Sequence, residues 1–124
     1  MRGEVIWVLG STVKEVKPGD LDHKKIGDLF EQVLLKDDNV VVKHEACFQL
    51  GENEFRDKID ALINSALHDP SELVRHEAIE ALGLMKAFEC DDVLRRCLKD
   101  KNEAVRQTAA FVIKQLTRLH GAQY

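Results

Sequence analysis

Apolar residues recur every three or four positions in several segments of the chain, and short polar stretches separate these segments. This spacing is typical of amphipathic helices that bury one face. In the later part of the chain, from about residue 55 on, each of two such stripes is followed by a polar turn and then by another helical pattern. The stripes consist of Ile59, Leu62, Ile63 and Ala66, and of Val93, Leu94, Cys97 and Leu98. We therefore predict an all-α fold assembled from helix-turn-helix units.

The helix that closes each unit is repeated in the sequence. It reads VKHEACFQLG over residues 42–51 and VRHEAIEALG over residues 74–83. The histidines of the two copies, His44 and His76, are 32 residues apart. A period of this length is the signature of helical hairpins that stack into a solenoid.

Two further copies flank this pair and lack its His-Glu dipeptide. One keeps the turn pattern over residues 99–106 but continues with Gln107 and Thr108. The other lies at the N-terminus and has Gly3 where the histidine would stand. The repeated dipeptide is therefore confined to the two central copies.

The repeat spacing predicts one domain over residues 1–124, an all-α solenoid of about three helical hairpins. An additional helix is expected over residues 2–9. The stretch from 11 to 20 contains Pro18-Gly19 and has no clean periodicity, so we expect a loop there.

Helix starts are indicated by acidic residues before the closing helices. Asp69 is the expected N-cap of the second such helix, with Pro70 at its first helical position and Glu72 three residues after the cap. Asp100 and Glu103 repeat the spacing in the next unit.

The orientation of the His-Glu pair follows from a rotation of about 100° per residue along a helix. His76 lies roughly 200° from Val74, away from the core, and Glu77 borders the buried stripe. Besides Val74, the predicted stripe consists of Ala78, Ala81, Leu82 and Met85. Because equivalent helices of a solenoid stack side by side, the two His-Glu pairs should lie next to each other on one concave surface.

Imidazole and carboxylate groups gathered in this way can bind a transition metal ion. The candidate ligands are His44, Glu45, His76 and Glu77. The alternative is a solvated surface pair that was copied when the repeat was duplicated and that has no ligand function.

Composition narrows the classes of partner. The chain has 18 Lys and Arg against 22 Asp and Glu, a net charge of −4, so it lacks the basic excess that nucleic-acid binding uses. Its apolar stretches are too short for a signal sequence or a membrane span, so we expect a soluble, cytoplasmic protein. Three cysteines, an odd number, favour reduced thiols over a disulfide framework.

The order of these motifs resembles a known family. A degenerate repeat, the two quoted motifs and a ligand-free closing repeat are similar to one half of deoxyhypusine hydroxylase, an enzyme built of HEAT-like repeats. The fourth residue after each histidine also fits, with Phe48 in the first motif and Glu80 in the second. The resemblance implies that four His-Glu motifs from two pseudo-symmetric halves bind two irons, which activate O2 to hydroxylate a modified lysine of a translation factor.

Carried over to this chain, the resemblance makes His44, Glu45, His76 and Glu77 iron ligands. Two His-Glu motifs supply only half of such a site, so a second chain would have to supply the rest. A two-fold homodimer would do so, with two iron ions shared between the subunits. The hypothesis from the sequence is thus a metal-binding repeat protein, in its sharpest form an O2-dependent hydroxylase of a protein substrate. The alternative is a non-catalytic scaffold that binds another protein.

Overall fold

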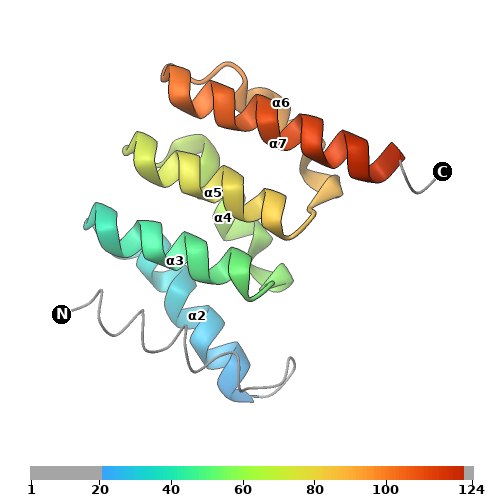
Figure 1. The fold of residues 1–124 in the computed structure, drawn as a ribbon. Coiled ribbons are helices and arrows are strands. Elements are labelled where there is room, and N and C mark those ends of the chain that lie inside the picture. Colours follow the sequence, from blue (N-terminus) through green and yellow to red (C-terminus); the bar gives the residue numbers. More distant parts are fainter. Residues whose placement is uncertain (1–20, 122–124) are drawn as a thin grey trace.

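A computed structural model describes residues 21–121 of the chain, and every regular element within that range is helical (Figure 1). The helices form three antiparallel hairpins stacked in sequence order, which confirms the predicted solenoid. The hairpins pair α2 (Leu21–Lys36) with α3 (Val40–Glu52), α4 (Ile59–His68) with α5 (Glu72–Leu84), and α6 (Asp91–Cys97) with α7 (Glu103–Gly121). Short 3-10 turns, η1 (Arg56–Lys58) and η2 (Phe88–Cys90), lead into α4 and α6. The helix expected over residues 2–9 and the loop at 11–20 lie outside the described residues.

The hairpins arrange their helices in two layers. The closing helices α3, α5 and α7 lie side by side in one layer, and α2, α4 and α6 lie behind them (Figure 1). The core fills the space between the layers, and the predicted stripe of α5 is buried in it. Val74, Ala78, Ala81, Leu82 and Met85 are each at most 2% exposed. None of the described helices is long and apolar enough to cross a membrane.

The start of α5 differs from the prediction. Ser71, not Asp69, is the N-cap residue, and its hydroxyl accepts a hydrogen bond from the Leu73 N–H. Pro70 therefore precedes the helix. One Asp69 carboxylate oxygen accepts the Ser71 N–H at 2.9 Å, and the other accepts the Lys43 amine at 2.8 Å. Lys43 belongs to the preceding repeat and is buried, and a buried ammonium group requires a charged partner. Asp69 supplies that partner and so joins the two repeats.

In the next repeat, too, the cap differs from the predicted one. Asn102, not Asp100, caps α7 by accepting a hydrogen bond from the Val105 N–H. Asp100 precedes the cap and receives two bonds from the guanidinium of Arg75, at 2.8 and 3.2 Å. Burial alone would raise the pKa of Asp100, but the hydrogen bonds from Arg75 and from the Asn102 N–H hold it below its usual value. The Lys43–Asp69 and Arg75–Asp100 pairs thus form a buried ladder that fixes each hairpin against the next.

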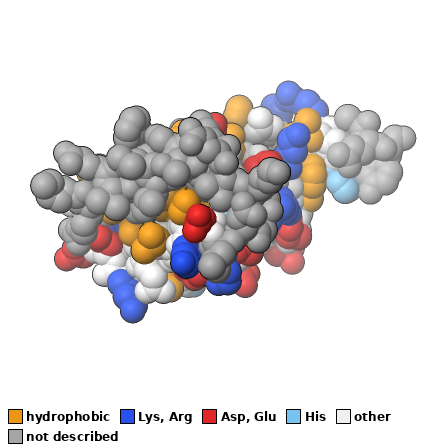
Figure 2. Space-filling model, turned by 90° about the horizontal axis from the view of Figure 1, so that it is seen from below, with side chains coloured by type: hydrophobic (Ala, Val, Ile, Leu, Met, Phe, Trp, Pro, Cys, Tyr) orange, Lys and Arg blue, Asp and Glu red, His pale blue; other side chains and the backbone are white. Residues whose placement is uncertain are grey.

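The described residues on the α2 side of the stack form a mixed surface. Acidic, basic and hydrophobic side chains are interspersed over the described part of this face (Figure 2). Leu29 and Leu35 of α2 are 49% and 55% exposed.

The closing helices approach one another closely at two glycines. A Cβ atom at Gly51 of α3 would lie 2.8 Å from the Cα and the Cβ of Ala81 in α5. At Gly83 of α5 a Cβ would lie 3.1 Å from a methyl group of Val112 in α7. At Gly51 the added Cβ would meet the backbone of Ala81, which cannot move without shifting the helix. At Gly83 it would meet only the methyl groups of the Val112 side chain.

We expect Gly51→Ala to lower the free energy of unfolding by about 1–3 kcal/mol, because it forces α3 away from α5. Gly83→Ala is the matched control. A small displacement of Val112 accommodates its methyl group, and the better helix propensity of alanine offsets up to about 1 kcal/mol. Urea denaturation followed by circular dichroism measures both variants. Equal stability of the two would contradict the assignment of this contact as the one that sets the helix spacing.

Candidate metal centre

The two His-Glu pairs lie on neighbouring helices at equivalent positions. His44 and Glu45 are in α3, and His76 and Glu77 are in α5. The His44 Nε2 atom lies 3.1 Å from a carboxylate oxygen of Glu77. The histidine of one repeat therefore meets the glutamate of the next, and the contact is made across the helix interface rather than within either pair.

Glu80 is a further carboxylate at this site. One of its oxygens lies 3.3 Å from His76 Nε2, one helical turn back on the same helix. His76, Glu77 and Glu80 each place a potential ligand atom within 4.8 Å of the others. The ligands predicted from the sequence did not include Glu80. Its spacing of four residues from His76 was the available signal, because residues four apart share a helix face.

Glu45 is held differently. Its carboxylate accepts a hydrogen bond of 2.9 Å from the side-chain amide of Gln49, which in turn accepts one from Asn53. These contacts stay on α3 and at its end. His44 and Glu77 are thus brought together across the interface, with His76 on the same helix as Glu77. Glu45 is instead hydrogen-bonded to a residue of its own helix.

The centre combines one buried carboxylate with two accessible imidazoles. Glu77 is 7% exposed, whereas the side chains of His44 and His76 are 44% and 35% exposed. Burial raises the pKa of Glu77, and the neighbouring His44 acts in the opposite direction. Since both imidazoles reach solvent, an ion could approach them from outside and meet the buried carboxylate behind them.

A hollow of about 410 Å³ adjoins the centre on the α3–α5–α7 layer. Glu77 and Glu80 contribute polar groups to its lining, and Phe48 of α3 and Phe111 of α7 contribute aromatic ones. The Phe111 side chain is 67% exposed, the highest value among the large apolar residues of α5 and α7. A mostly apolar cavity with a few polar groups at one side is the usual form of a binding site for an organic group.

Comparisons with known proteins place these residues in a family context. Residues 27–114 match the family model for HEAT repeats. The chain is 28% identical over 122 residues to deoxyhypusine hydroxylase of Saccharomyces cerevisiae, which covers 97% of this chain and 38% of that protein. It is 38% identical over 90 residues to deoxyhypusine hydroxylase of Gallus gallus, covering 70% of this chain and 30% of the relative.

A solved structure of human deoxyhypusine hydroxylase in complex with glycerol has a similar fold. The TM-score is 0.67 with 22% identity, and the match covers 98% of this chain and 46% of the human one. The chain therefore spans less than half the length of each of these relatives. The likeness confirms the resemblance inferred from the motifs and confirms the fold.

Replacing Glu77 should reveal the cost of burying its charge. Because its folded-state pKa is raised, the parent protein binds a proton more tightly when folded, and its stability falls as pH rises above the unfolded-state pKa of about 4.3. We expect the metal-free Glu77→Gln variant to be more stable than the parent at pH 7 to 8, with the difference shrinking towards pH 4.

Thermal unfolding across that pH range measures the effect. Glu45→Gln, at the matching position of the first motif, is the control and should change stability less, because Glu45 is more exposed than Glu77. A Glu77→Gln variant that is less stable than the parent at every pH would contradict this description of the site.

Proposed function

Because this chain belongs to the HEAT-repeat family, we propose that its repeats hold a metal centre for O2-dependent hydroxylation of a protein side chain. The observation that carries the proposal is the contact between His44 of one repeat and Glu77 of the next. A charged pair copied onto a solvated face has no reason to bury one of its carboxylates, and Glu77 is buried.

The donor set fits iron. His44, His76 and Glu77 provide two imidazoles and one carboxylate, the combination that non-haem Fe(II) oxygenases use with open positions for other ligands. Glu45 and Glu80 are further carboxylates on the same two helices. Bound iron would supply the activation of dioxygen.

The side chains of the protein prepare this centre. His44 Nε2 and His76 Nε2 already face the carboxylates of Glu77 and Glu80, so a cation would bridge groups that the fold has gathered. Burial of Glu77 favours an ion beside it, since a cation would compensate a charge that is otherwise poorly solvated. The adjoining hollow would receive the substrate side chain.

The relatives are deoxyhypusine hydroxylases, and we propose a substrate of the class that their name gives, a modified lysine carried by a protein. Two His-Glu pairs are half of the ligand set implied by the resemblance. We propose that a two-fold homodimer supplies the other half and shares two iron ions, with the α3–α5–α7 layers of the two chains facing each other.

A second candidate is a non-catalytic scaffold. The exposure of Phe111 beside the hollow favours it, because exposed aromatic side chains are frequent at protein interfaces. In that case the layer binds a protein partner without any chemistry.

Iron binding distinguishes the oxygenase from the non-catalytic scaffold. Protein purified from iron-supplemented cells should retain iron, and a His44→Ala/His76→Ala variant should bind it at least about tenfold more weakly. His68→Ala/His120→Ala, which removes two exposed imidazoles elsewhere, is the matched control and should bind like the parent. Elemental analysis measures the bound metal. If the parent holds no more iron than the first variant, the oxygenase proposal fails and the scaffold remains.

Assembly is tested separately. Light scattering at micromolar concentration should give twice the chain mass with iron, and chelation should favour the monomer, because ligands from both subunits would hold the dimer together. Phe111→Glu should weaken the dimer by placing a charge on the facing layer. Leu35→Glu, at an exposed apolar position of α2 in the layer behind the closing helices, is the control. A monomer under both conditions would leave the centre without its second half.

A further inference from the structure

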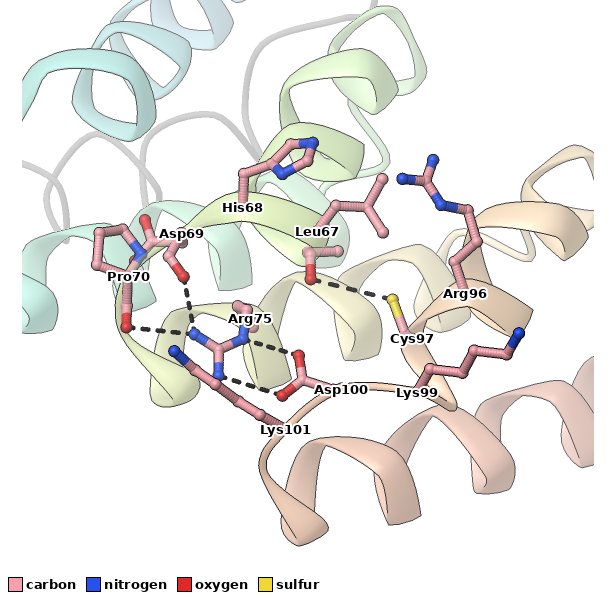
Figure 3. A pocket seen from close by; sticks show the side chains of 11 residues that line it. Leu67, His68, Asp69, Pro70, Arg75, Arg96, Cys97, Lys99, Asp100 and Lys101 are labelled. Atoms are coloured by element: carbon pink, nitrogen blue, oxygen red, sulfur yellow. Dashed lines mark hydrogen bonds and ion pairs between the residues drawn. The ribbon is translucent and has the colours of Figure 1, made fainter.

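A second hollow, of about 450 Å³, lies at the edge of the stack, between the α4–α5 turn and the α6–α7 turn (Figure 3). It shares no lining residue with the hollow beside the candidate metal centre. Its lining includes four Lys and Arg side chains and two Asp side chains. This part of the surface is therefore basic, although the whole chain has a net charge of −4. We call this second hollow the basic cleft.

The two carboxylates of the basic cleft are already occupied. Asp69 binds the Lys43 amine at 2.8 Å. Asp100 binds Arg75 through both of its oxygens, and Arg75 donates its remaining bonds to the Asp69 and Pro70 carbonyls (Figure 3). The ladder that joins the repeats therefore neutralises the acidic groups of the cleft and leaves none to pair with its outer cations.

Three cations of the cleft have no carboxylate partner. Arg96, Lys99 and Lys101 are exposed and form no ion pair with the described part of the chain. Arg96 extends towards Leu67 and His68, and Lys101 extends across the Arg75–Asp100 pair (Figure 3). The adjacent Arg95 shows the contrast, because it binds Asp91 at 2.8 Å on its own helix.

We propose that the basic cleft binds a dianionic phosphoryl group. A guanidinium and an ammonium group on two sides of a cleft can each donate to a separate phosphate oxygen. His68 at the rim would add a third donor. The volume exceeds that of a single phosphate, so a phosphate ester with a small organic body fits as well as the free ion.

The binding is tested with three probes on the full chain at low ionic strength: inorganic phosphate, phenyl phosphate and glutarate, a dianion without phosphorus. Amide chemical shifts in NMR spectra should move, saturably, for residues in the two turns around 67–70 and 96–102. Phosphate or phenyl phosphate should bind more tightly than glutarate. Tighter binding of phenyl phosphate identifies an ester as the ligand, and equal binding identifies the free ion.

A pair of variants with the same net charge locates the site. Arg96→Gln/Lys101→Gln should weaken phosphate binding at least about tenfold, since each charge-assisted contact contributes more than a neutral one. Lys25→Gln/Lys114→Gln removes two exposed cations elsewhere and should bind like the parent. All four positions are exposed, so both variants should melt like the parent.

Three outcomes overturn the proposal: absence of saturable shifts in the two turns, glutarate binding as tight as phosphate, or an equal loss in both variants. The cleft and the candidate metal centre share no residue, so failure here is separate from failure of the metal proposal.

Discussion

The spacing between α3 and α5 is the constraint on which the candidate centre depends. Gly51 lets α3 approach the backbone of Ala81, and the buried Lys43–Asp69 pair joins α3 to the turn that begins α5. These contacts fix both the distance and the register of the two helices. His44 follows Lys43 directly in α3, so the same register brings it within 3.1 Å of Glu77.

The buried charges of the stack differ in how well they are compensated. Lys43 and Arg75 each have a carboxylate partner, which offsets the loss of hydration. Glu77 has instead a partly exposed imidazole, and burial still raises its pKa. A carboxylate held in this way costs stability in the metal-free protein, and such groups concentrate at functional sites.

The Lys43–Asp69 and Arg75–Asp100 pairs also account for the positive charge at the edge of the stack. Because Asp69 and Asp100 are used to join the repeats, their turns carry uncompensated positive charge at Arg96 and Lys101. The face of the closing helices and the edge of the turns thus present different chemistry, one with carboxylates, imidazoles and exposed apolar groups, the other with cations. Both follow from one mode of stacking.

The sequence by itself determined the helical hairpins, the buried stripe of α5 and the outward placement of His76, because each follows from the periodicity within a single helix. It did not determine that Ser71 caps α5, because Asp69 is as good a cap by type. The Asp69 carboxylate instead accepts bonds from the Ser71 N–H and from the buried Lys43 of another repeat. Nor did it show that His44 meets Glu77 or that Glu80 joins the cluster. Which side chains touch across helices depends on the distance, register and rotamers of packed elements, and the tertiary structure alone decided these.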